Sequence, residues 1–332
     1  MMRVELTLKT VTPLFLGGAD QQPELRPASV RGALRFWLRA ALGGVIGDAD
    51  LDRLHYLEAN VFGEMERGSA VVVRLSHSGF SKSEEPLLPH RTGGQAGIVK
   101  AVPVGTPFNL ILNLRPCAGS QLLEIATWTA LLWLTLGGIG RRSRRGAGSV
   151  RIQAVVTIPD EFSDDLKRCL NAATTTATDG QVLANRVGDL LVKARQVFTT
   201  FAPTTSLRFS SGLPSFSILP PNTRVVVWTP PNTDLNNYKT VLMPLMENMS
   251  SLASLGSNFG DAFGGINPRR SSPLHVTAHR LEQEWALTLT YLKAEIQCGD
   301  NGKPAEVTKF LNSLRPKWEI SPRAAQGGTR HE

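Results

Sequence analysis

Residues 137–149 read GGIGRRSRRGAGS, a segment with five glycines, four arginines and no acidic residue. This pattern matches neither the Walker loop, GxxxxGK followed by Ser or Thr, nor the GxGxxG dinucleotide motif. The segment also follows a predicted helix and precedes a predicted strand, which is the reverse of the order in both nucleotide-binding motifs. A nucleotide-cofactor site is therefore disfavoured, and we expect no cofactor.

The chemistry that this loop supports is phosphate binding by arginine side chains. At the C-terminal end of a helix the unpaired backbone groups are carbonyls and the helix dipole is negative, so the backbone offers no anion site. Glycines such as Gly138 and Gly140 permit positive φ angles and let another backbone approach closely. We predict a ribose-phosphate cradle whose cations are Arg141, Arg142, Arg144 and Arg145. The alternative is a solvated turn whose arginines pair with acidic residues elsewhere in the chain.

A second basic feature lies in a helix predicted over residues 30–42, for which Ser29 is the expected N-cap. Its arginines recur at intervals of four and therefore form one ridge along the helix, Arg31, Arg35 and Arg39. Such a ridge can follow successive phosphates, although an ordinary exposed face explains the same stripe equally well. Gly32 favours the binding interpretation, because glycine inside a helix costs about 1 kcal/mol relative to alanine. We infer that a partner comes close at this point.

A third cluster, residues 263–276, repeats the combination of glycines with adjacent arginines before a predicted strand. The arginines are Arg269 and Arg270, and a glycine-rich loop over residues 256–265 precedes them. We predict that this pair also contacts RNA, so that each half of the chain binds through adjacent arginines beside a glycine-rich loop.

The histidines indicate neither a metal site nor a catalytic centre. His275 and His279 are four residues apart, but the segment HVTAH lacks the glutamate of HExxH and lies in a predicted strand. Metal-free RNA cleavage usually needs a histidine, tyrosine or lysine near the binding loops, and along the sequence the histidines do not accompany the arginine motifs. Asp20 is the one acidic residue beside such a motif. We therefore predict binding without catalysis.

Composition and charge agree with a soluble protein that binds a polyanion. The chain has 332 residues and an excess of 36 Lys and Arg over 28 Asp and Glu, which gives a net charge of +8. Three widely spaced cysteines indicate neither zinc nor a disulfide framework and fit a reducing cytoplasm. The start lacks an apolar signal core, and the most apolar stretch, residues 125–136, is too short to span a bilayer. We expect no membrane partner.

Hydrophobic periodicity predicts an α+β fold. In the first half we expect strands and helices in the order β-α-β-β-α-β, with an additional helix over residues 51–62. This order is that of a ferredoxin-like (RRM-like) unit, in which both helices cover one face of a four-stranded antiparallel sheet and the opposite face is free to bind. Three tryptophans in the helices are expected in the core, Trp37, Trp128 and Trp133.

The second half is less regular and reads as a degenerate copy of the first. We expect helices over residues 181–198, 236–255 and 305–314 and strands over 224–229, 273–280 and 284–294. From Pro159 an acidic, threonine-rich segment is interpreted as the linker between the halves. The predicted organisation is two tandem ferredoxin-like domains, residues 1–160 and 161–332.

Several segments of the chain resemble the RAMP superfamily of CRISPR effector complexes, and among its members the first subunit of the Cmr (type III-B) complex. They are LFLGGAD, ELRPASVRGALRFWLR, NVFGE, GGIGRRSRRGAGSV and RRSSPLHV, in this order. The resemblance implies a tandem ferredoxin-like fold and a place at the end of the complex that holds the 3′ region of the guide RNA, near the 5′ end of the target RNA. It also implies other Cmr subunits as partners and assigns target cleavage to a different, repeated subunit. The alternative is a metal-independent RNA-processing endoribonuclease of the same superfamily.

Overall fold

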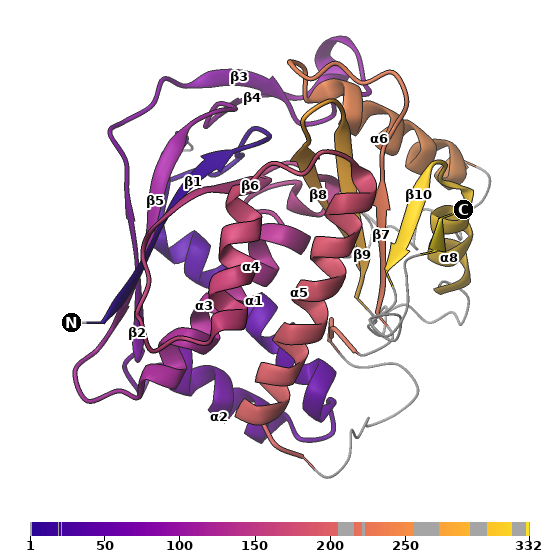
Figure 1. Cartoon of the computed structure of the whole chain (residues 1–332). Coiled ribbons are helices and arrows are strands. Elements are labelled where there is room, and N and C mark those ends of the chain that lie inside the picture. The colour runs from indigo at the N-terminus through magenta and orange to yellow at the C-terminus, as the bar shows by residue number, and fades with distance from the viewer. Residues whose placement is uncertain are drawn as a thin grey trace.

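The computed structural model describes residues 2–18, 20, 22–204, 216–220, 223–254, 272–292, 304–320 and 330–331. The described residues form two large antiparallel sheets and one two-stranded sheet, with helices between the large sheets and on the far side of the second one (Figure 1). The expected α+β class with antiparallel sheets is therefore confirmed. None of the helices in the described ranges is long and apolar enough to cross a membrane.

The first sheet has the strand order β2-β5-β1-β6. Its strands are β1 (Arg3–Thr10), β2 (Val71–Ser76), β5 (Pro107–Leu114) and β6 (Val150–Thr157). Alternate side chains of β1, namely Val4, Leu6 and Leu8, are fully buried, as the sequence alternation predicts. The helices that pack on this face are α1 (Pro27–Ile46), α2 (Leu51–Phe62) and α3 (Ser120–Leu136). Trp37, Trp128 and Trp133 lie in this core, as predicted.

The opposite face of the first sheet is polar and carries no aromatic ring on its described strands. Thr7 faces Asn109 across β1 and β5, and Arg74 faces Ile111 across β2 and β5. RNA-recognition modules that bind on a sheet do so by stacking bases on aromatic side chains. This face therefore lacks the groups for base stacking, and the expectation that it serves as the binding surface is not supported.

Helix α1 begins earlier than the sequence suggested. Its first helical residue is Pro27, and Arg26 precedes it without a side-chain cap. Proline suits this position because its missing N–H needs no partner there and its φ angle is already helical. Ser29 therefore lies inside the first turn, and its predicted role as N-cap is wrong.

The segment interpreted as a linker is largely helical. It forms α4 (Asp164–Thr174) and the start of α5 (Gly180–Phe201). Leu166, Cys169 and Leu170 are spaced to lie on one face of α4, and all three are buried in the larger hydrophobic core, which both halves share. The threonine-rich composition concealed this short apolar stripe, which is why the sequence reading missed α4.

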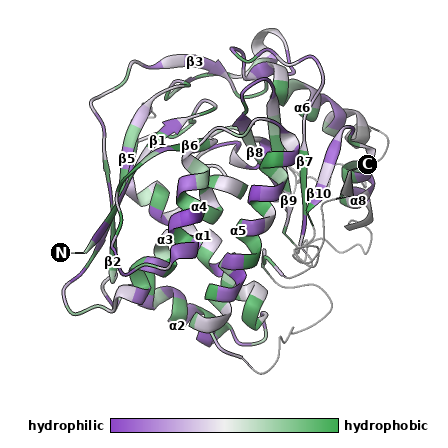
Figure 2. Ribbon diagram, viewed as in Figure 1, coloured by the Kyte–Doolittle hydropathy of each residue, from purple (hydrophilic) through white to green (hydrophobic). Residues whose placement is uncertain are grey.

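The second sheet has the order β11-β10-β7-β9-β8. Its strands are β7 (Arg224–Trp228), β8 (Leu274–Arg280), β9 (Trp285–Tyr291), β10 (Lys317–Ile320) and β11 (Arg330–His331). Helices α6 (Lys239–Ser254) and α8 (Pro304–Ser313) cover one face, and α5 covers the other (Figure 1). All residues of β9 are consequently buried, and Figure 2 colours most of β7 as hydrophobic. The order β10-β7-β9-β8 repeats the order β6-β1-β5-β2 of the first sheet.

A hairpin of β3 (Ser83–Pro86) and β4 (Ile98–Ala101) lies above the first sheet and contacts the second half of the chain (Figure 1). The hydroxyl of Tyr238 in the second half donates a hydrogen bond to the Glu85 carboxylate at 2.8 Å. Ala101 also packs with Phe15 and Ala147, and Ala147 belongs to the glycine-rich segment. The hairpin therefore covers one side of the loop that the sequence singles out.

Candidate nucleic-acid interface

The glycine-arginine loop, residues 137–149, folds back on itself between α3 and β6. The backbone N–H of Ile139 donates to the carbonyl of Gly148 at 3.0 Å. Two further backbone bonds tie the loop to the segment after β1: Arg141 N–H donates to Phe15 at 3.0 Å, and Gly148 N–H donates to Pro13 at 2.9 Å. These bonds fix the path of the loop, from which Arg141 and Arg142 project into solvent.

The glycines of the loop are required by the packing of the chain itself. Gly140 and Gly148 have φ angles of +88° and +71°, which favour glycine. A Cβ atom on Gly148 would lie 1.9 Å from the carbonyl oxygen of Ile139, and one on Gly138 would lie 2.9 Å from that of Ala147. The space beside these residues is filled by protein. The glycines therefore shape the loop, and the idea that they admit a foreign backbone needs correction.

The loop is also the joint between the two halves. The hydroxyl of Thr277 on β8 donates to the carbonyl of Gly137 at 3.0 Å, and the N–H of Ala278 donates to Ser149 Oγ at 2.8 Å. Gly146 lies against Leu242 of α6, which a Cβ atom there would approach to 2.5 Å. β8 is the edge strand of the second sheet, so these bonds hold that edge against the loop.

Three of the four loop arginines have no acidic partner in the described part of the chain. Arg141 and Arg142 are exposed, and Arg144 donates to the carbonyl of Ser272 while its guanidinium lies 5.5 Å from the ring centre of Phe36. Partial burial lowers the pKa of Arg144, and burial followed by the charges of Arg142 and Arg144 lowers the pKa of Arg145 to about 10. The alternative of acid-paired arginines is therefore not supported for Arg141, Arg142 and Arg144.

A surface pocket of about 270 Å³ lies between α1 and this loop. Four of the residues predicted from the sequence line it together: Ser29, Gly138, Gly140 and Arg144. The tertiary structure thus unites the helix motif and the loop motif in one concave site with a cationic rim. An anionic strand that enters here meets positive charge that no carboxylate among the lining residues offsets.

His275 is the pocket residue that sequence reasoning missed. β8 places its ring in a stack with Phe36, 5.1 Å between centroids, and in an edge contact with Trp37 at 5.5 Å. Its Nε2 is buried and has no hydrogen-bond partner in the described ranges. Burial, followed by the charges of Arg144 and Arg145, keeps the pKa of His275 well below its usual value. The prediction that the histidines lie away from the arginine motifs is therefore wrong, because His275 and Arg144 line the same pocket. This proximity arises from the position of β8 against the loop, which the sequence does not show.

The predicted arginine ridge on α1 is divided into two parts. Arg39 Nε lies 3.2 Å from a carboxylate oxygen of Glu58 on α2, and Arg35 binds the other oxygen. Glu58 is only 2% exposed, so both arginines are held in fixed positions. Arg31 is exposed and forms no ion pair with a described acidic residue. At Gly32 no atom lies within 4 Å of the Cβ position, so nothing in the described chain requires glycine there.

Three further residues were singled out in the sequence, namely Arg269, Arg270 and Asp20. Arg269 and Arg270 lie outside the described residues. Asp20 is exposed, and its carboxylate accepts a hydrogen bond from the N–H of Gln22 at 2.9 Å. Among the described residues no group of three or more histidine, cysteine, aspartate or glutamate side chains is placed to hold a metal ion.

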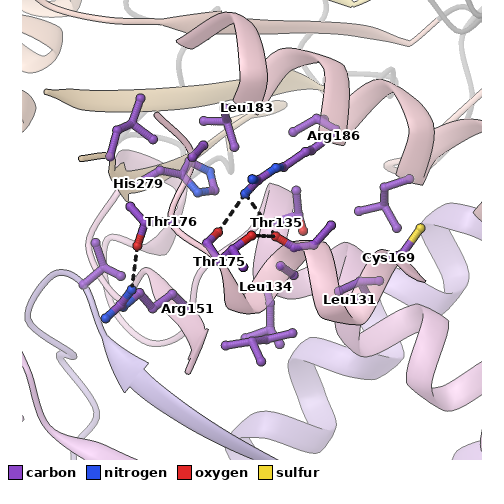
Figure 3. Close-up of a pocket in the computed structure, with 18 of the residues that line it drawn as sticks. Leu131, Leu134, Thr135, Arg151, Cys169, Thr175, Thr176, Leu183, Arg186 and His279 are labelled. Carbon is purple, nitrogen blue, oxygen red and sulfur yellow. Dashed lines mark hydrogen bonds between the residues drawn. The ribbon is translucent and has the colours of Figure 1, made fainter. Parts of the chain in front are cut away.

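A different pocket, of about 140 Å³, lies among α3, α4, α5 and β8 (Figure 3). Its walls are mainly apolar, and Arg186 is already engaged: it donates to the carbonyls of Ala172 at 3.0 Å and Thr175 at 2.7 Å. His279 Nε2 lies 2.9 Å from Thr288 Oγ1. This pocket is a packing space at the junction of the halves, and its polar groups are used within the chain.

His279 makes the stability of the protein depend on pH. Desolvation in the packed interior lowers its pKa from 6.5 to about 4, so the unfolded chain binds the proton first as the pH falls. The free energy of unfolding should therefore decrease between pH 6.5 and 4, with a contribution from His279 of roughly 3 kcal/mol. Urea unfolding at several pH values, together with NMR titration of the His279 ring, measures this. A ring that titrates near pH 6.5 in the folded protein would contradict it.

Comparisons with known proteins agree on one family. The model of the RAMP superfamily matches residues 7–151. The CRISPR system Cmr subunit Cmr1-2 of Pyrococcus furiosus is 31% identical over 174 residues, which cover 44% of this chain and 92% of that protein. Subunit Cmr1-1 of the same organism is 29% identical over 192 residues, which cover 50% of this chain and 56% of that protein.

Solved structures share the fold over most of the chain. The crystal structure of Cmr1 from Pyrococcus furiosus in its apo form has a TM-score of 0.68 at 21% identity and covers 96% of this chain and 99% of that one. A chain of the type III-B Cmr-β complex bound to cognate target RNA and AMPPnP has a TM-score of 0.58 at 14% identity, with coverages of 94% and 98%. With the sequence matches above, these observations show that the chain belongs to the RAMP superfamily and, within it, to the family of the CRISPR Cmr subunits Cmr1-1 and Cmr1-2.

Proposed function

We propose that this chain is a non-catalytic subunit of a type III-B CRISPR effector complex that binds single-stranded RNA at the pocket between α1 and the glycine-arginine loop. The observation that supports this most directly is that Arg144 lines the pocket and that the neighbouring Arg141 and Arg142 are exposed on the same loop, with no acidic partner for any of the three among the described residues. Guanidinium groups bind phosphate through charge-assisted hydrogen bonds, and their positions are fixed by a loop that cannot move freely.

The finer parts of the proposal concern which RNA is bound and how the chain is divided. We assign the pocket to the 3′ region of the guide RNA and the adjoining target RNA, because the family resemblance implies that position. We interpret residues 1–160 and 161–332 as two ferredoxin-like domains, the second degenerate. The repeated strand order of the two sheets supports this division.

Binding of RNA by the purified protein tests the proposal. Fluorescence anisotropy with a labelled single-stranded RNA of about 16 nucleotides, near the upper site size of single-strand binders, should show saturable binding that weakens linearly on a log-log plot as salt rises. The RNA should remain intact in EDTA. Absence of binding at low salt, both alone and in the assembled complex, would overturn the proposal.

A second candidate function is a metal-independent endoribonuclease, and His275 is the observation that favours it. Its imidazole lies at the pocket and is neutral, so it has a nitrogen that can accept a proton, but its lowered pKa makes it a weak base. The other polar side chains that line the pocket are Ser29, Ser143 and Arg144, so a matching general acid is not evident among the described residues. Discrete cleavage of repeat-containing RNA in EDTA, lost in His275→Ala, would establish this candidate in place of the first.

A further inference from the structure

Phe36 forms part of two adjoining hollows. On one side it lines the pocket at the glycine-arginine loop, and on the other it lines a hollow of about 460 Å³ between α1 and α2. Apart from Phe36 and Arg39, the residues that line the second hollow lie outside the motifs singled out in the sequence. Because one half-buried ring belongs to both, a strand bound at the loop that passes Phe36 enters the second hollow directly.

The walls of the second hollow suit a flat, apolar group. Leu51, Leu54 and Phe216 line it together with Phe36. Unpaired bases are commonly held on aromatic and apolar side chains in this way, and every base has a face that can stack. These four side chains carry no hydrogen-bonding group, so the stacking surface itself predicts little preference between bases; His55 and Ser217, which also line the hollow, are the residues that would supply one.

The charged residues of the hollow suit a nucleotide better than a protein side chain. Arg39 and Glu58 both line it, and Glu58 is held by Arg39 and Arg35 together. Two guanidinium groups against one carboxylate leave this edge with net positive charge, and Arg39 keeps 48% of its side chain exposed. A phosphate that follows the base therefore meets an arginine whose position is already fixed.

We propose that the hollow between α1 and α2 binds an unstacked base of the same RNA strand whose backbone is held at the glycine-arginine loop. This inference rests on the proposed RNA-binding function and names a second nucleotide position within it. Phe36 separates the two positions, so the strand is held by its backbone on the loop side and by a base on the α2 side.

The variant Leu51→Glu tests the proposal at small cost to the fold. Leu51 is 52% exposed and is the first residue of α2, where an acidic side chain favours the helix dipole. A glutamate there places negative charge at the hollow. Tyr56→Glu is the matched control, because Tyr56 is 55% exposed on the same helix and does not line the hollow. Both variants change the net charge equally.

The measurement combines these variants with RNAs that carry one abasic site at each position in turn. In the wild-type protein and in Tyr56→Glu, one position should lose affinity about tenfold when its base is removed. In Leu51→Glu the affinity for intact RNA should already be about tenfold lower, and the abasic site at that position should cost nothing further.

The outcomes separate this inference from the function on which it rests. If the wild-type protein binds no RNA, the proposed function fails. If it binds RNA but no position is sensitive, or if Leu51→Glu behaves as Tyr56→Glu does, only the base site is overturned. If Leu51→Glu impairs assembly with other Cmr subunits and leaves RNA affinity unchanged, the hollow holds a protein side chain, and the base site is likewise overturned.

Discussion

Replacement of Arg141 and Arg142 by glutamine is expected to lower the affinity for single-stranded RNA by roughly 10- to 100-fold. These two loop arginines are exposed and have no acidic partner among the described residues, so their charge is available to phosphate. Because each phosphate contact on a single strand contributes about 0.7 to the salt slope, the double variant should also reduce that slope by about 1.4. Anisotropy titrations at several salt concentrations measure both quantities.

The matched control for this variant is the double replacement of Arg74 and Arg115 by glutamine. Both residues are exposed, do not line the pocket at the loop and form no ion pair among the described residues, and the net charge changes by the same amount. This control should keep the wild-type salt slope and nearly the wild-type affinity. If the loop variant and the wild-type protein show the same slope of log affinity against log salt concentration, the loop arginines do not contact phosphate.

Gly148→Ala is expected to destabilise the folded protein by at least about 3 kcal/mol. Its Cβ would lie 1.9 Å from the carbonyl oxygen of Ile139, and its φ angle of +71° is strained for alanine. The clash is with backbone, so no side-chain rotation relieves it. The loop also accepts hydrogen bonds from Thr277 and Ala278 of β8, so distortion of the loop should weaken these bonds between the two halves as well. Urea unfolding measures the change, and an unaltered midpoint would contradict this account of the loop.

Gly32→Ala is the informative comparison, because the same atom is added at a site with nothing within 4 Å. The free protein should become more stable by about 0.5 to 1 kcal/mol, since alanine favours the helix. If RNA approaches α1 closely at this point, the same variant should bind RNA less tightly. A gain in stability together with a loss of affinity is a result that a purely structural role of Gly32 does not produce.

The sequence by itself predicted the elements whose residues repeat with a clear period. β1 and β5 alternate strictly, α1 and α3 bury residues at helical spacing, and the strand order of the first sheet follows from these elements in sequence. The arginine loop stood out because five glycines and four arginines lie together in 13 residues. Helix α4 did not stand out, because its apolar stripe is short and surrounded by threonines.

The tertiary structure alone decided which residues meet at the site. Pairing of β8 with β9 and its contact with the loop carry His275 to Phe36, although 239 positions separate them in the sequence. Because α2 packs on α1, Arg35 and Arg39 form ion pairs with Glu58, whereas Arg31 stays exposed. Periodicity reports which face of an element is buried, but it does not report which distant side chain lies against that face. That information arises only when the sheets and helices pack, so the ion pairs, the stacked histidine and both hollows were beyond the reach of the sequence.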